Sequence, residues 1–195
     1  GDFKAQCLTI KESGANYAYV GNLGGSVISL LKSCNTVGAD VTYMGNIWAG
    51  DYLTIQAAEA KDYVFPTATP FWDAAADGMA LVYKIADDSG FSKDAKPTHH
   101  YIRGVCSAYY MKEAMEWAKA NGGLTGENIK KGMYVNQNWT PKGLEGVCLP
   151  SSWSPEDHRG STVVSINKGS FEDGAVNIER IAEMTLPRRD DWVGY

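Results

Sequence analysis

Two stretches of the sequence decide the fold: residues 17–26 read YAYVGNLGGS, and residues 41–51 read VTYMGNIWAGD. Each stretch passes from a short apolar run of strand length into a glycine-containing turn. Leu30 and Leu31 then mark a helix after the first stretch, and residues 52–60 continue as a helix after the second. The pattern therefore predicts two strand–turn–helix units in succession.

The neighbouring segments continue the same alternation. Residues 3–13 have the apolar periodicity of a helix, which Gly14 ends. Residues 63–65 form a third short apolar run, closed by Pro66 and Pro70. Helix and strand thus alternate three times with short spacers, which predicts an α/β fold whose parallel sheet has flanking helices and right-handed crossovers. Because the series opens on a helix and supplies three strands, we expect an incomplete domain.

The remainder of the chain is first helical and then irregular. It predicts helices over residues 75–88, 99–121 and 125–133, with a polar stretch over 89–97 and an irregular segment over 134–157. The last part alternates apolar and polar residues over 161–167 and 175–181, around a turn that contains glycine. That pattern is typical of a β-hairpin.

Composition and charge exclude several functions. The 195 residues carry 18 basic and 23 acidic side chains, for a net charge of −5, spread along the chain. A nucleic-acid surface would need clustered basic residues, and we interpret Lys130–Lys131 and Arg188–Arg189 as solvated faces. No apolar run approaches the roughly 18 residues that cross a bilayer, and the first residues lack a signal-peptide pattern.

The four cysteines leave two possibilities open. Cys7, Cys34, Cys106 and Cys148 are widely spaced and form no CxxC pair, which argues against structural zinc. Two disulfides would suit an oxidising compartment, and buried free thiols fit the same spacing.

The glycine-rich turns are the candidate binding loops. Free N–H groups at the start of a helix attract carboxylate or phosphate, so residues 21–26 indicate either a ligand-facing loop or a tight turn that needs glycine. Residues 45–50 stand at the same position after the next strand, where open parallel sheets bind ligands. Trp48 in this second loop has the right side chain to stack on a ligand.

Motifs of enzymes and cofactor sites are not found in the sequence. It contains neither GxGxxG nor GxxxxGK[ST], and no G-x-S-x-G elbow. His99 and His100 are adjacent, so on a helix they point in different directions and would not share a metal. We therefore expect no catalytic residue, no metal and no cofactor.

Seven segments, taken in their order and spacing, resemble type I periplasmic solute-binding proteins of ABC transporters, the leucine/isoleucine/valine-binding-protein-like family. Five are similar to the second lobe, one to the helix that returns to the first lobe, and one to the segment that crosses back before the closing hairpin. The segments are, in that order, 2–6 (DFKAQ), 13–15, 17–21, 30–32, 43–46 (YMGN), 101–118 and 154–161 (SPEDHRGS).

The resemblance implies an incomplete two-lobe architecture. Members of the family have two α/β lobes joined by three hinge strands, with the ligand in the cleft between them. Residues 1–70 would form part of lobe two, residues 71–153 the returning part of lobe one, and residues 154–195 the return to lobe two with the hairpin. The half that precedes them in the family would then be missing.

The function implied is that of the extracytoplasmic, periplasmic substrate-binding component of an ABC importer. Such a protein closes around a small molecule and docks on membrane permease subunits. The same resemblance implies a monomer that is not an enzyme, binds no nucleic acid and is compatible with a lipid anchor. The alternative on the same fold is the ligand-binding sensory domain of a receptor or kinase.

The resemblance also implies the site and its ligand. In branched-chain amino acid binders, the loop matching Asn46–Trp48 supplies an acid that meets the ligand ammonium, but Ile47 stands there and the nearest acid is Asp51. An ammonium without a counter-charge pays a desolvation penalty, so an aromatic or branched carboxylate without the amine suits the site better. The implied ligand-binding residues are Asn22, Leu23, Gly24, Asn46, Ile47 and Trp48.

Overall fold

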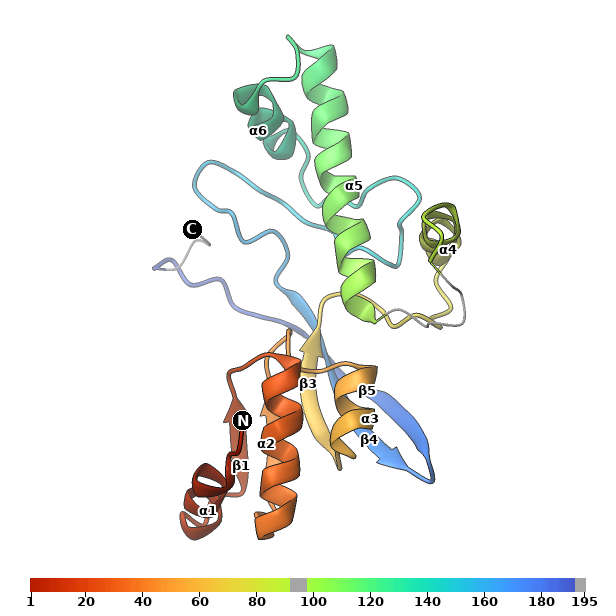
Figure 1. The fold of residues 1–195 in the computed structure, drawn as a ribbon. Coiled ribbons are helices and arrows are strands. Elements are labelled where there is room, and N and C mark those ends of the chain that lie inside the picture. The colour runs from red at the N-terminus through yellow and green to blue at the C-terminus, as the bar shows by residue number, and fades with distance from the viewer. Residues whose placement is uncertain (92–97, 192–195) are drawn as a thin grey trace. The chain divides into compact units, whose positions relative to one another are not determined.

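The computed structural model describes residues 1–91 and 98–191, so the end of the predicted polar stretch and the last four residues of the predicted return to lobe two lie outside the described residues. The chain divides into two compact units (Figure 1). Unit 1 consists of Gly1–Thr67 and Val164–Met184, and unit 2 consists of Ala68–Val163 and Thr185–Tyr195. The chain therefore passes between the units three times.

Unit 1 is built on a five-stranded sheet in the order β1-β2-β3-β4-β5. Its strands are β1 (Tyr17–Val20), β2 (Thr42–Gly45), β3 (Tyr63–Thr67), β4 (Val163–Glu172) and β5 (Ala175–Thr185). The first three strands are parallel, as the alternation predicted, and β4 is antiparallel to β3. The α/β fold class is confirmed, and the predicted hairpin extends the sheet into a mixed one.

Strand β3 continues past the proline that was expected to close it. The register of β3 with β4 runs through Pro66, which lies opposite Ile166, and ends at Thr67 opposite Ser165. A proline cannot donate a ladder hydrogen bond, so the local sequence favoured an end at this residue. Pairing with β4, about a hundred residues later in the chain, keeps the strand extended.

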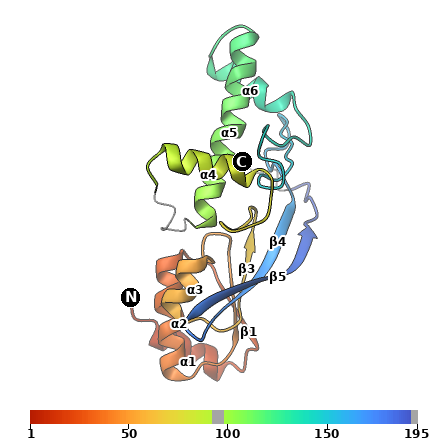
Figure 2. The ribbon, with the colours of Figure 1, turned by 90° about the vertical axis from the view of Figure 1, so that its right-hand side faces the viewer.

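Three helices complete unit 1: α1 (Lys4–Glu12), α2 (Gly24–Val37) and α3 (Tyr52–Ala58). Figure 2 shows α2 and α3 on one side of the sheet. The strand residues on that face are buried together with the inner faces of the helices. This core contains Val27, Leu31, Tyr43, Ile55, Tyr63 and Phe65.

Unit 2 is helical, with α4 (Met79–Asp88), α5 (His99–Ala120) and α6 (Gly126–Tyr134). The predicted helices are present, although α4 begins later than residue 75. At Gly78 the chain comes so close to the segment around Leu144 that an added Cβ would lie 2.8 Å from main-chain atoms there. Within the described residues, no helix combines the length and apolar character needed to cross a bilayer.

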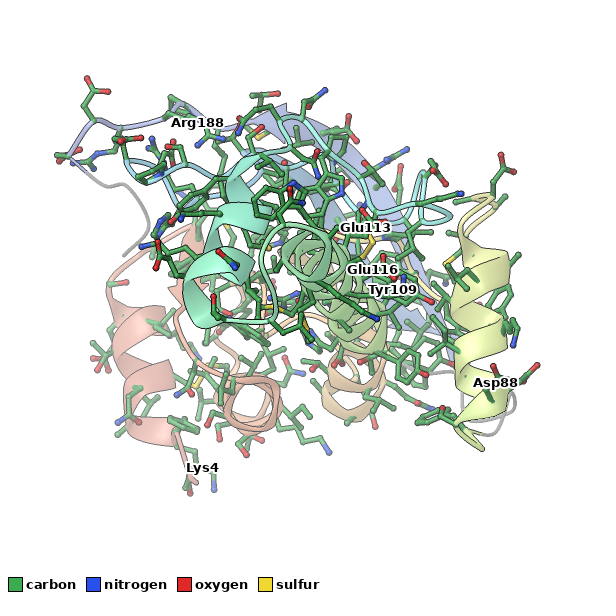
Figure 3. All side chains as sticks on the ribbon, turned by 90° about the horizontal axis from the view of Figure 1, so that it is seen from above. Lys4, Asp88, Tyr109, Glu113, Glu116 and Arg188 are labelled. Carbon is green, nitrogen blue, oxygen red and sulfur yellow. A yellow bond between two sulfur atoms is a disulfide. The ribbon has the colours of Figure 1, made fainter. Side chains whose placement is uncertain are left out.

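The long irregular segment of unit 2 folds against α5 through aromatic and polar contacts. The rings of Tyr110, Trp139 and Trp153 pack edge to face at 4.8–5.7 Å. The carboxylate of Glu113 on α5 (Figure 3) accepts hydrogen bonds from the Trp139 indole, at 2.8 Å, and from the Lys142 main chain, at 2.6 Å. The bond to the buried Trp139 satisfies a polar group that would otherwise be buried unpaired.

All four cysteines form disulfides, which settles the question that their spacing left open. Cys7 pairs with Cys34 and joins α1 to α2 within unit 1. Cys106 pairs with Cys148 and joins α5 to the irregular segment within unit 2.

Arg188, labelled in Figure 3, is exposed, as the sequence suggested, and it also forms an ion pair. Its guanidinium contacts the carboxylate of Asp157 and donates to the Gly160 carbonyl oxygen at 2.8 Å. Arg159 donates to the same carboxylate through two nitrogens, at 2.8 and 2.9 Å. The partner of Arg188 lies 31 residues away, so the Arg188–Arg189 pattern alone could not reveal it. Lys130 and Lys131 are exposed, as predicted.

This cluster makes the stability of unit 2 depend on pH. Hydrogen bonds from the Arg159 side chain hold the pKa of the Asp157 carboxyl well below its ordinary value of 3.8. Because the folded-state pKa is the lower one, the contribution is complete above about pH 4 and is lost as the pH falls further. Urea unfolding of Asp157→Asn should show a loss of about 1 kcal/mol at pH 7, after solvent screening. The difference from the unchanged protein should shrink towards pH 2, and a constant difference would contradict this account.

Candidate ligand-binding loops

The two predicted binding loops follow β1 and β2. Val20 at the end of β1 is in register with Gly45 at the end of β2, and the strands are parallel. Both loops therefore emerge at the same edge of the sheet, where α2 and α3 begin. The structure thus brings together the six residues that the resemblance implied, whereas their contact with a ligand stays a prediction.

The side chain of Asn46 ties one loop to the other. Its Nδ2 donates to the main-chain oxygen of Asn22 at 3.1 Å, and its Oδ1 accepts from the main-chain N–H of Trp48 at 2.7 Å. Within the first loop, the Asn22 side chain accepts from the Leu23 N–H at 2.8 Å. The two asparagines thus fix the backbone at Leu23 and Trp48.

Two large apolar side chains are exposed on these loops. Leu23 is 63% exposed and Trp48 is 55% exposed, while Ile47, between Asn46 and Trp48, is partly buried. A single exposed apolar residue is ordinary on a protein surface. Two of them on loops that a hydrogen bond joins provide area on which the apolar body of a small molecule can rest.

The start of α2 carries a positive end without a side-chain cap. Leu23 occupies the N-cap position, and no side chain accepts a hydrogen bond there. The helix dipole favours a carboxylate at such a position. Gly24 also has a packing role, because an added Cβ would lie 2.9 Å from the Thr54 hydroxyl on α3. Of the two interpretations of this turn, the packing requirement is therefore supported at Gly24.

Sequence reasoning missed the residues beneath the second loop. The loop starts at Gly45 and ends at Gly50, and each glycine faces a fully buried aromatic ring of β3. An added Cβ at Gly45 would lie 1.8 Å from the Tyr63 hydroxyl, and one at Gly50 would lie 2.0 Å from the Phe65 ring. Two glycines that bracket a loop were the signal of close approach. Nothing local points to the rings, which read as ordinary core residues.

The Tyr63 hydroxyl donates to the main-chain oxygen of Ala49 at 3.3 Å. Burial raises the pKa of Tyr63 far above its ordinary value, so the hydroxyl stays protonated and remains a donor. The ring of Tyr63 stacks on that of Phe65 at 5.8 Å. The loop that carries Trp48 therefore rests on a rigid base.

The acid nearest to Ile47 serves a helix. Asp51 is the N-cap of α3, and its carboxylate accepts the Thr54 N–H at 2.7 Å. N-cap carboxylates satisfy an otherwise unpaired donor and oppose the positive end of the helix. Part of the hydrogen-bonding capacity of Asp51 is thus used within the chain.

Parallel strand–turn–helix units with candidate binding loops at the strand ends are the architecture of a type I periplasmic-binding-protein fold, and the solved structures that share the fold are such proteins. The model of the family described as periplasmic binding protein matches residues 1–174, and the chain belongs to that family. A comparison with curated protein sequences gives no match.

Solved structures share the fold at low sequence identity. A branched-chain amino acid ABC transporter protein from Thermus thermophilus with bound valine is 19% identical, with a TM-score of 0.79, and the match covers 93% of this chain and 49% of that one. A substrate-binding protein from Aeropyrum pernix is 18% identical (TM-score 0.79; 96% and 49% covered). A solute-binding protein from R. palustris in complex with 4-hydroxybenzoate is 15% identical (TM-score 0.74; 94% and 49% covered). The chain thus spans about half the length of these proteins.

Proposed function

We propose that the chain is part of the substrate-binding component of an ABC importer, that it works outside the cytoplasm, and that it catalyses no reaction. Membership of the periplasmic binding protein family supports this proposal. The observation that carries it is the pair of loops joined by Asn46, which present Leu23 and Trp48 at the carboxyl ends of parallel strands. Permease subunits in the membrane would be its macromolecular partners.

The three-part division of the chain is part of the same proposal. Residues 1–70 and 154–195 would belong to lobe two, and residues 71–153 to lobe one. The borders of the compact units after Thr67 and after Val163 support the first two crossings, whereas the residues from Thr185 group with unit 2. The crossing back would then lie about ten residues later than residue 154.

We further propose that the ligand is a small carboxylate with a branched or aromatic body and no α-amine. Ile47 offers no counter-charge to an ammonium, and Asp51 already caps α3. The uncapped start of α2 suits a carboxylate, and Leu23 and Trp48 suit an apolar body. Structures of this fold with valine and with 4-hydroxybenzoate support the idea that the fold accepts both ligand classes.

Titration calorimetry with a matched pair of ligands tests the proposal. 4-Methylpentanoate is leucine without its amine, so the pair isolates the effect of the ammonium. In the full-length protein, 4-methylpentanoate should bind at least about tenfold more tightly than leucine, a difference of ~1.4 kcal/mol. 4-Hydroxybenzoate extends the test to aromatic acids. Tight binding of leucine or valine, with both acids silent, would show that the ligand class is wrong.

A further inference from the structure

We propose that Asn46 and Tyr63 are positioning residues, which hold the loop of residues 45–50 so that Trp48 and Leu23 form an apolar contact surface before any ligand arrives. Asn46 was implied as a ligand contact by the resemblance, and Tyr63 was not implied at all. The inference rests on the proposed function for its effect on binding. Its effect on the loop itself is independent of any ligand.

Asn46 acts on main-chain groups of both loops. Its Oδ1 accepts a hydrogen bond from the N–H of Trp48, two residues later in the chain. This bond closes a tight local turn and fixes the backbone of Trp48. Its Nδ2 donates a hydrogen bond to the carbonyl oxygen of Asn22 in the neighbouring loop. Each half of the amide therefore makes a bond that sets one loop against the other, and this geometry assigns Asn46 a positioning role.

Tyr63 acts from below the loop. Its side chain is fully buried, and its hydroxyl occupies the space that a side chain at Gly45 would fill. From there it donates to the Ala49 carbonyl, next to Trp48 in the chain. Ala49 is itself fully buried, so losing this donor would leave its oxygen without the partner that the structure provides. Any effect of Tyr63 on binding must act through the loop, because the ring has no exposed surface.

Preorganisation explains why holding the loop in place matters for affinity. A loop that must be ordered when the ligand binds subtracts that cost from the binding free energy. Binding sites that are held by packing and hydrogen bonds beneath them avoid this cost. We therefore expect loss of either tether to weaken binding of an apolar carboxylate while the fold is retained.

Tyr63→Phe tests the role of the hydroxyl, and Tyr43→Phe is its matched control. Tyr43 lies on the adjacent strand β2, is buried, and donates its hydroxyl to a main-chain oxygen, that of Ala39, at 3.1 Å. Both variants thus remove one buried hydroxyl–carbonyl bond, and both should lose similar stability. Ala39 precedes β2, so only the bond of Tyr63 reaches the candidate binding loop.

Hydrogen exchange read by mass spectrometry gives the ligand-independent result. Tyr63→Phe should accelerate exchange in peptides covering residues 46–50 about tenfold, the factor that corresponds to one lost hydrogen bond, and Tyr43→Phe should leave them unchanged. Asn46→Ala should accelerate exchange in residues 46–50 and also around Leu23, because it releases both loops. Equal exchange in the two tyrosine variants would overturn the inference.

The second result is the affinity for 4-methylpentanoate, measured on the same variants of the full-length protein. Tyr63→Phe should weaken binding about five- to tenfold and Tyr43→Phe less than twofold. If the unchanged protein binds no carboxylate while exchange still separates the two variants, the proposed function fails and the positioning of the loop stands. If hydrogen exchange separates the two tyrosine variants but affinity does not, Tyr63 holds the loop without serving recognition, and the inference fails.

Discussion

Replacing Gly50 by alanine should destabilise unit 1 by about 3 kcal/mol, at the upper end of what overpacking usually costs. The added Cβ would lie 2.0 Å from Cγ of Phe65 and 2.4 Å from its Cβ. Phe65 is fully buried and stacked on Tyr63, so its ring has no free space into which it can move. Urea unfolding followed by far-ultraviolet circular dichroism measures the loss.

Gly25→Ala is the matched control for this prediction. Gly25 lies in the first turn of α2, and nothing approaches within 4 Å of the position that a Cβ would take there. Alanine favours the helix over glycine by up to about 1 kcal/mol, so this variant should be neutral or more stable. Comparable losses in the two variants would show that the loss at Gly50 does not come from the close approach to the Phe65 ring.

The local architecture was accessible from the sequence because each element carries its own signal. Short apolar runs, followed by glycine turns and amphipathic helices, located the three strands and their order. The parallel direction of the strands then placed the two loops at one edge, and with them Asn22, Asn46 and Trp48. These predictions needed no information about residues distant in the chain.

The features that escaped prediction depend on partners far away in the sequence. Pro66 remains in a strand because β4 pairs with it, and Arg188 is held by Asp157. Tyr63 was visible as a core residue, but its bond to Ala49 depends on the close approach of two glycines to the ring. The disulfides belong to the same class, because widely spaced cysteines allow several pairings as well as free thiols.

Removing the disulfide of unit 2 should have a larger effect than Gly50→Ala. Cys106 and Cys148 are 42 residues apart, and closing a loop of that length contributes about 4 kcal/mol in the chain-entropy account. The bond joins α5 to a segment of little regular structure, within the aromatic core of unit 2. Against a typical domain stability of about 5–15 kcal/mol, the double variant Cys106→Ala/Cys148→Ala should leave the segment around residues 135–153 open to hydrogen exchange at 37 °C.

The disulfide of unit 1 provides the comparison that separates loop entropy from structural context. Cys7 and Cys34 are 27 residues apart, so the two bonds differ by only ~0.4 kcal/mol in loop entropy. The length of chain that loses protection should nevertheless differ between the two disulfide variants, because Cys7 is the one buried residue of α1. Cys7→Ala/Cys34→Ala should release α1 and leave protection of β1–β3 intact, whereas loss of the other bond should expose most of the irregular segment. Hydrogen exchange resolved by peptide distinguishes the two patterns, and unchanged protection of residues 135–153 without Cys106 and Cys148 would show that the aromatic core holds this segment unaided.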